Sequence, residues 1–127
     1  MTFKVKSEIL GFENMKELEL TKVDELFSTL RSTEDNNISF TIVNPHALRE
    51  YTFDISQEVE ERLEIKNEED LMVYNIVVIQ NPLDESRINF LAPLIFNKAN
   101  NTMAQTILDV NDNQNFGLDE ILKTYIK

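Results

Sequence analysis

The longest apolar stretch in the sequence runs from Val73 to Ile79 and is interrupted only by Asn75. Asn81 and Pro82 follow closely, and this dipeptide favours a turn. A run of this length bounded by turn residues is typical of a β-strand with both faces buried. It is far shorter than the ~20 apolar residues that a membrane-spanning helix needs. We therefore predict a strand over 73–80 at the centre of the fold.

Shorter segments on both sides of this run alternate between apolar and polar residues, as expected for strands with one buried face. The alternation is clearest over 38–43 (Ile-Ser-Phe-Thr-Ile-Val), a β-branched segment that ends at Asn44-Pro45. The other strand-like segments contain Phe3 and Val5, Leu18 and Leu20, Tyr51 to Ile55, Ile88 to Leu91, Leu94 to Phe96, and Thr102 to Leu108. The pattern predicts a mainly β fold.

Two segments break this alternation and predict helices. In the first, Ser56 can cap a helix N-terminus, and Val59 and Leu63 form an apolar pair four residues apart. The second spans 118–127, with acidic residues in its first turn and lysines in its last. Its apolar residues recur at helical spacing: Leu118, Ile121, Leu122 and Tyr125. We expect a short helix after the middle strands, a polar linker from about residue 110, and a C-terminal helix that covers the β core or docks on a partner.

The length of 127 residues is typical of one domain with one hydrophobic core. Glycine occurs twice and proline three times, so no Gly- or Pro-rich linker divides the chain. Residues 1–6 lack the long apolar stretch of a secretory signal. The absence of cysteine fits a reducing compartment. We predict a single cytoplasmic domain over 1–127 that binds no membrane.

The charge balance is strongly acidic, with 12 Lys and Arg against 23 Asp and Glu and a formal net charge of −11 at pH 7. Nucleic-acid binding depends on Lys and Arg that neutralise phosphate, and no basic patch occurs along this chain. We therefore expect no direct binding of RNA or DNA. The acidic run over 58–70 either keeps a helix face solvated or steers a basic partner toward the protein.

Few residues are suited to catalysis. The single histidine, His46, has no cluster of metal ligands or nucleophiles near it in the sequence. There is no cysteine, no Gly-x-Ser-x-Gly elbow and no phosphate-binding glycine loop. We predict that the protein is not an enzyme and uses no cofactor. A hydrolase that relies on a pair of carboxylates stays open as an alternative, because so many acids supply candidates.

One segment has the spacing of a calcium-binding loop. Its residues at template positions 1, 3, 5 and 12 are Asp109, Asn111, Asn113 and Glu120. The sixth position, however, holds Gln114 where the sharp turn needs glycine, and the segment before the loop is strand-like rather than helical. We therefore predict no metal site.

Four groups of residues, in this order and spacing, resemble the FliW family of bacterial flagellar assembly factors over about Phe3 to Asp109. They are Gly11-Phe12-Glu13, Val43-Asn44-Pro45 leading to Tyr51, the apolar strand at 73–80, and 89–97 (Asn-Phe-Leu-Ala-Pro-Leu-Ile-Phe-Asn) followed by 105–109 (Gln-Thr-Ile-Leu-Asp). The chain departs from the family at Glu8 and Leu10, where the family's opening motif has glycine and proline, and in its tail after Asp109. The family pattern also places a strand at Phe27 to Arg31, where the apolar spacing alone favours a helix.

The resemblance implies a small antiparallel β-barrel-like protein that binds both flagellin and the RNA-binding translational regulator CsrA. In the family's scheme, flagellin occupies the factor until it is secreted, and the released factor then captures CsrA and relieves repression of flagellin mRNA. The resemblance thus implies a protein-binding antagonist. A chaperone that binds flagellin alone is a further alternative.

The motif positions supply the candidate partner-binding residues. Pro93 lacks an N–H group and so favours a sheet edge or bulge, which leaves backbone near Asn89, Leu91 and Asn97 for a partner strand or helix. The other candidates are Phe12, Glu13, Pro45 and Tyr51. For every one of them, a role in turn or core architecture competes with a contact role. Since flagellin's terminal segments are amphipathic helices, the expected receptor is an apolar groove with a polar rim.

Overall fold

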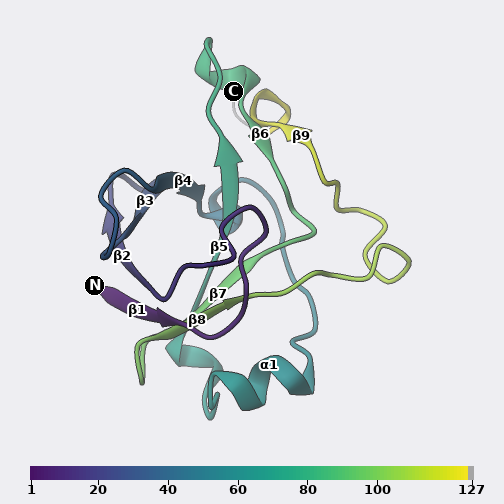
Figure 1. The fold of residues 1–127 in the computed structure, drawn as a ribbon. Helices are drawn as coiled ribbons and strands as arrows, with labels where there is room; N and C mark the ends of the chain where they lie inside the picture. Colours follow the sequence, from purple (N-terminus) through teal and green to yellow (C-terminus); the bar gives the residue numbers. More distant parts are fainter. Residues whose placement is uncertain (126–127) are drawn as a thin grey trace.

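Seven strands close into a barrel in the computed structural model, which describes residues 1–125 (Figure 1). In ring order they are β1 (Thr2–Val5), β2 (Glu17–Lys22), β3 (Phe27–Ser32), β4 (Ser39–Val43), β5 (Leu71–Val78), β7 (Leu94–Asn97) and β8 (Thr102–Gln105). The predicted mainly β, barrel-like fold is confirmed. The strand at Phe27 is also confirmed, against the helical spacing of its apolar residues.

One strand pair departs from the predicted antiparallel arrangement. β8 pairs with β1 in parallel, with Lys4 opposite Thr102 and Val5 opposite Met103. All the other pairs around the ring are antiparallel. In a ring of strands that alternate in direction, an odd number of strands always leaves two parallel neighbours. The parallel seam is therefore a consequence of having seven strands.

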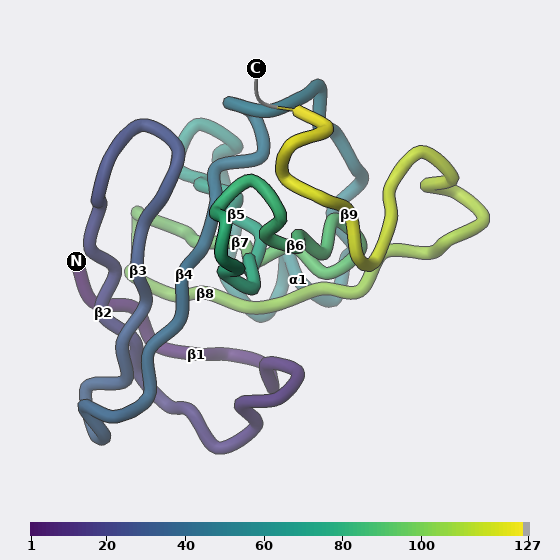
Figure 2. Tube along the Cα trace, turned by 90° about the horizontal axis from the view of Figure 1, so that it is seen from above, coloured from purple at the N-terminus to yellow at the C-terminus, as the bar shows by residue number. Residues whose placement is uncertain are grey.

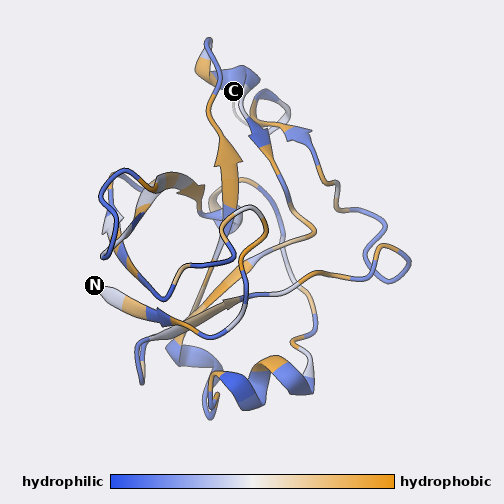
Figure 3. Ribbon diagram, in the orientation of Figure 1, coloured by the Kyte–Doolittle hydropathy of each residue, from blue (hydrophilic) through white to orange (hydrophobic). Residues whose placement is uncertain are grey.

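β5 is the central strand, as its apolar run predicts. It pairs with β4 on one edge and, on the other, with β7 and with the short β6 (Arg87–Ile88). Successive side chains of a strand point to opposite faces. Accordingly, Met72, Tyr74 and Ile76 pack inside the barrel, and Val73 and Val77 pack against the outer layers. In Figure 3, β5 carries a strongly hydrophobic band through the fold.

The barrel interior is filled by large apolar side chains from every wall. Its fully buried members include Phe3, Leu18, Leu30, Ile42, Leu94, Phe96 and Met103. The rings of Phe3 and Phe96 meet edge to face with their centroids 5.0 Å apart. Complete burial of one such side chain contributes about 1.5–3 kcal/mol, so this layer is the main source of stability.

The predicted short helix is α1 (Gln57–Arg62), which covers the outer face of β7 and β8. Ser56 caps it by accepting a hydrogen bond from the N–H of Val59 at 3.3 Å. Val59 and Leu63 pack on Ile95 and Ala104, while the acidic residues of the helix stay exposed. No helix among the described residues is long and apolar enough to cross a membrane.

The predicted C-terminal helix over 118–127 is wrong as far as the structure describes the segment, and residues 126 and 127 lie outside it. β9 (Glu120–Ile121) pairs with β6, and one 3₁₀ turn, η4 (Leu122–Thr124), follows. The N–H of Leu122 donates to the carbonyl of Ser86 at 2.8 Å, and its side chain is fully buried. This pairing supplies the backbone hydrogen bonds that a helix would have made. Figure 2 shows the segment beside β6.

Three other predicted strands are shorter than expected or absent. Of Ile88 to Leu91 only Ile88 belongs to a strand, and β8 ends at Gln105 instead of Leu108. The segment Tyr51 to Ile55 is extended but pairs with no strand. The remaining short elements are 3₁₀ turns: η1 (Pro45–Ala47), η2 (Glu68–Asp70) and η3 (Leu83–Glu85).

Candidate protein-binding site

A cavity of about 330 Å³ opens between the N-terminal turn, the end of β5 and the C-terminal segment. We call it the Phe12 groove. Its lining is Leu10, Phe12, Ile76, Val78, Arg87, Ile88, Asn89, Ala92, Gln105, Leu118 and Asp119. The walls are mostly apolar, and the polar side chains are few. Such a composition suits the apolar face of another polypeptide.

A tight turn over Ile9 to Phe12 forms one wall of the groove. The N–H of Phe12 donates to the carbonyl of Ile9 at 2.7 Å, and Gly11 at the third turn position has φ +85°. A type II turn needs positive φ there, which glycine adopts without strain. Leu10 stands at the second position, where proline is favoured but not required. The turn therefore forms although Leu10 and Glu8 depart from the family motif.

Two contacts fasten this turn to the barrel. The ring of Phe12 stacks on Phe40 of β4 with centroids 4.7 Å apart and an angle of 23° between the planes. The side chain of Gln105 accepts a hydrogen bond from the N–H of Leu10 at 2.8 Å and donates one to the carbonyl of Ala92 at 3.2 Å. Leu10 can make this bond because, unlike proline, it keeps its N–H.

Three apolar side chains of the groove are largely exposed: Leu10 at 60%, Val78 at 58% and Leu118 at 63%. Each comes from a different part of the chain, and the fold brings them to one place. Single exposed apolar residues are common on protein surfaces, but several around one concavity mark an interaction site.

The rim of the groove combines one cation, one anion and two amides. The guanidinium of Arg87 lies 3.5 Å from the carboxylate of Asp119. The side-chain oxygen of Asn89 accepts a hydrogen bond from the N–H of Leu91 at 2.9 Å, which fixes the Asn89 side chain. The rim therefore offers donors and acceptors around an apolar floor.

The structure brings two of the predicted partner-binding residues, Phe12 and Asn89, together in this groove. Glu13 follows Phe12, is exposed, and accepts a hydrogen bond from the N–H of Gly11 at 3.3 Å. The other five lie in the interior: Pro45, Tyr51, Leu91, Pro93 and Asn97. In this conformation those five shape the fold and are not accessible to a partner.

Tyr51 illustrates this internal role. Its hydroxyl donates to the carbonyl of Phe90 and accepts a hydrogen bond from the amide of Asn75 at 3.2 Å. That amide also donates to the carbonyl of Asn89 at 3.0 Å, while the Oδ1 of Asn75 has no partner among the described residues. Burial raises the pKa of Tyr51 to about 12, because the phenolate would be poorly solvated there. The network positions the strand that leads to Asn89.

The remaining interior positions hold turns in place. The Asn97 side chain donates to the carbonyl of Leu63 at 2.8 Å and accepts from the N–H of Ala99 at 3.0 Å. The carbonyl of Pro93 accepts a hydrogen bond from the N–H of Thr106 at 3.1 Å, and that of Leu91 accepts from Leu108 at 2.8 Å. These bonds join the segment before β7 to the end of β8.

Three groove residues, Leu10, Val78 and Leu118, are not among the partner-binding residues predicted from the sequence. The sequence does carry a sign of Val78, because Val78 and Ile79 extend the apolar run past Val77, the last buried residue of the strand. Its helical spacing predicts Leu118 on the apolar face of a C-terminal helix, which residues 118–125 do not form. Its exposure depends on the pairing of β9 with β6, which no local pattern reveals.

Arg49 was missed as well. Its guanidinium lies over the rings of Phe90, Phe116 and Tyr125, at 5.1, 4.9 and 5.4 Å from their centroids. It also donates to the hydroxyl of Tyr125 at 2.9 Å and lies 3.5 Å from the carboxylate of Glu120. We call these five residues the Arg49 clasp. It fastens the C-terminal segment to the rest of the fold and so holds the wall that carries Leu118.

The residues of the calcium-like pattern do not converge on one point, and each makes hydrogen bonds of its own. Asp109 accepts a hydrogen bond from the N–H of Asn111 at 2.8 Å, and its carbonyl accepts one from the Asn113 side chain at 2.9 Å. Glu120, which belongs to the Arg49 clasp, instead accepts a hydrogen bond from the N–H of Gly117 at 2.6 Å. Over residues 1–125 the structure contains no group of three or more His, Asp or Glu side chains placed to hold a metal ion.

Comparisons with known proteins show the family of the chain and agree with its fold. The family model described as FliW protein matches residues 1–120. Flagellar assembly factor FliW 1 of Wolinella succinogenes is 46% identical over 127 residues, which cover 100% of this chain and 99% of that protein. Flagellar assembly factor FliW of Sulfurimonas denitrificans is 42% identical over the same shares of the two chains. The crystal structure of a flagellar assembly factor FliW matches with a TM-score of 0.85 at 25% identity, over 95% of this chain and 84% of that one.

Proposed function

Because the chain belongs to the FliW family of flagellar assembly factors, we propose that it binds flagellin and the translational regulator CsrA in the cytoplasm. It then couples flagellin synthesis to secretion: flagellin occupies it before export, and afterwards the free protein captures CsrA. It acts by binding alone and needs no cofactor.

The observation that supports this proposal most directly is the Phe12 groove. An amphipathic helix presents apolar side chains at i, i+3 or i+4, and i+7 to a groove of this kind. Leu10, Val78 and Leu118 supply exposed apolar surface for such a helix. Arg87, Asn89 and Asp119 can pair with its polar flanks. Flagellin's terminal segments have this amphipathic character, so the groove is their proposed receptor.

The acidity of the molecule supports the second partner. CsrA must present basic surface to its RNA, and the net charge of −11 attracts such a surface. The exposed carboxylates of α1 and η2 concentrate part of this charge on one side of the barrel, where α1 appears mostly hydrophilic (Figure 3). We propose that these elements steer CsrA toward the protein.

The test is co-elution of the purified chain with flagellin and with CsrA in size-exclusion chromatography, followed by measurement of both affinities. The double variant Val78→Ser and Leu118→Ser removes two exposed apolar contacts from the groove. We expect it to weaken flagellin binding by about thirtyfold, since each of the two lost contacts is worth roughly 1 kcal/mol.

The matched control is Val23→Ser with Val110→Ser. These valines are 62% and 58% exposed and lie outside the groove, so flagellin binding should be unchanged. Equal losses in the two double variants would contradict the groove as the receptor. Binding of flagellin without CsrA would leave a flagellin-only chaperone, and failure to bind either protein would overturn the proposed function.

A further inference from the structure

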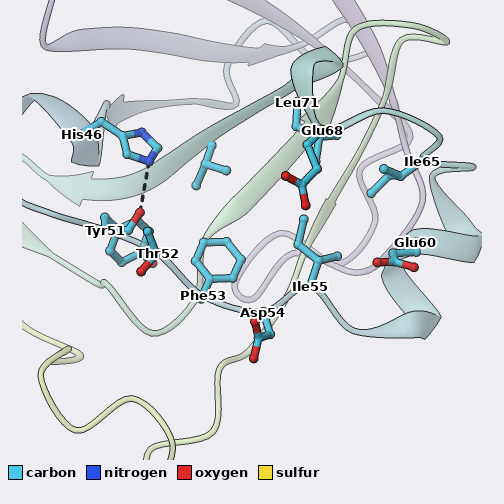
Figure 4. A pocket seen from close by; sticks show the side chains of 11 residues that line it. His46, Tyr51, Thr52, Phe53, Asp54, Ile55, Glu60, Ile65, Glu68 and Leu71 are labelled. Atoms are coloured by element: carbon cyan, nitrogen blue, oxygen red, sulfur yellow. Dashed lines mark hydrogen bonds between the residues drawn. The ribbon is translucent and has the colours of Figure 1, made fainter.

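A second cavity, of about 520 Å³, lies at the other half of β5 and shares no lining residue with the Phe12 groove. Leu71 of β5 lies on one side, and the extended segment Thr52 to Ile55 lies on the other (Figure 4). Val73 of β5 also lines the cavity. Figure 4 shows His46 near one end and Glu60 and Ile65 near the other. We call it the β5-edge cavity.

The edge of β5 beside this cavity has unpaired backbone groups. The carbonyl of Asp70 accepts a hydrogen bond from the N–H of Lys98 at 2.8 Å, so even-numbered residues of β5 direct their backbone groups toward β7. Odd-numbered residues face the opposite edge. There β4 pairs with β5 only as far as Val43 opposite Asn75. The N–H and carbonyl of Val73 therefore face the cavity without a strand partner.

The sequence explains why β4 does not extend further. Continuing the register would place Pro45 opposite Val73, and proline has no N–H to donate. The carbonyl of Pro45 is already used, because it accepts hydrogen bonds from Leu48 and Arg49 at 3.0 Å each. η1 thus turns the chain away and leaves the edge open.

The extended segment across the cavity is equally unpaired. Within residues 1–125, the N–H and carbonyl groups of Thr52 to Ile55 make no hydrogen bond, and only the carbonyl of Tyr51 is engaged, by His46 at 3.1 Å. Extended backbone with unpaired groups is a template for an added strand. The cavity therefore has such backbone on both sides.

The side chains around the cavity specify the chemistry of an added strand. Phe53, Ile65 and Leu71 offer apolar surface to alternate residues of such a strand. Asp54, Glu60 and Glu68 surround it with carboxylates, and the lining includes no lysine or arginine. A segment that alternates apolar with basic residues matches both features.

We propose that the β5-edge cavity binds an extended, basic segment of a partner protein as an additional β-strand paired with Val73. This goes beyond the proposed function, which uses a different groove and a helical ligand. Backbone hydrogen bonds hold the added strand, and the three carboxylates select its lysines or arginines.

The probe is a capped peptide of about eight alternating lysine and valine residues, a common strand length. Its binding to the full chain is measured by two-dimensional amide NMR and fluorescence anisotropy. We expect saturable binding with the largest shifts at Val73 and Thr52 to Ile55. The same peptide methylated on alternate backbone nitrogens cannot donate to the β5 edge, and it should bind about tenfold more weakly or worse.

Charge reversal at the cavity gives an independent readout. Glu60→Lys with Glu68→Lys, both at exposed positions, should weaken peptide binding by about tenfold. Glu19→Lys with Glu25→Lys changes the net charge equally at exposed positions elsewhere and should have a much smaller effect. Absence of saturable binding, shifts centred at another site, or equal effects of the two double variants would overturn the proposal. Neither flagellin nor CsrA enters this titration, so each proposal can fail alone.

Discussion

At the scale of single residues, the hydroxyl of Tyr51 makes a large contribution to the free energy of unfolding for a single polar group. It connects the carbonyl of Phe90 to the amide of Asn75 within the interior, where all three residues are buried. Tyr51→Phe leaves both groups without this partner, and we expect a loss of about 1–3 kcal/mol in the free energy of unfolding. Tyr74→Phe is the control, because the Tyr74 hydroxyl makes no hydrogen bond within the described residues.

Tyr51 also predicts how stability depends on pH. The pKa of Tyr51 is raised from 10.0 to about 12, so the folded state holds the phenolic proton more strongly than the unfolded chain does. This contribution is complete below pH 10 and is lost as the pH rises toward 12. Urea unfolding between pH 8 and 11.5 should therefore show a steeper alkaline loss for the wild type than for Tyr51→Phe. If stability fell equally with pH in the wild type and in Tyr51→Phe, the alkaline loss could not be attributed to Tyr51.

The sequence motifs marked residues important for the protein, but they did not distinguish residues that hold the fold together from residues exposed to a partner. Leu91 and Asn97 belong to a recognisable motif, and the structure shows that both fix turns inside the fold. Leu118 belongs to none of the quoted motifs, yet it lies exposed on the Phe12 groove. Exposure depends on which segments pack together, and a single sequence does not contain that information.

At the scale of elements, the Arg49 clasp decides how the C-terminal segment is held. The Arg49 side chain is only 18% exposed and lies among three aromatic rings. Arg49→Ala removes these contacts and leaves Glu120 without its cation. We expect a loss of roughly 2 kcal/mol in the free energy of unfolding, together with faster hydrogen exchange over 116–125.

Arg62→Ala is the matched control for this change. Arg62 also pairs with a glutamate, Glu58, at 2.6 Å, but its side chain is 48% exposed on α1. An exposed pair of this kind contributes only about 0.5 kcal/mol. If Arg49→Ala cost no more than Arg62→Ala and left the exchange of 116–125 unchanged, the clasp would have no anchoring role.

Elements were predictable where local pattern and packing agree. The apolar run at β5 predicts a buried strand, and the Ser56 cap predicts a helix. The structure contains both elements. The tail is different, because Leu118, Ile121, Leu122 and Tyr125 have helical spacing but the chain pairs with β6 instead. Pairing with a strand some thirty residues away outweighs a weak local preference, as often happens at short elements.

At the scale of the whole molecule, the net charge of −11 predicts how fast a basic partner associates with the protein. Long-range attraction accelerates encounter with a basic protein, and salt screens it over a Debye length of about 8 Å at physiological ionic strength. The association rate with CsrA, measured by stopped flow, should therefore fall markedly between low and physiological salt. A rate that does not respond to salt would assign the acidity to solubility alone.

The parallel seam between β1 and β8 has a consequence for synthesis of the protein. Lys4 emerges from the ribosome early and Thr102 late, so the first strand must wait for most of the chain before its edge is covered. The Phe12 groove needs Leu118 in addition to Leu10, and thus later still. A chain synthesised only to a point before Leu118 therefore lacks one wall of the Phe12 groove, the proposed receptor.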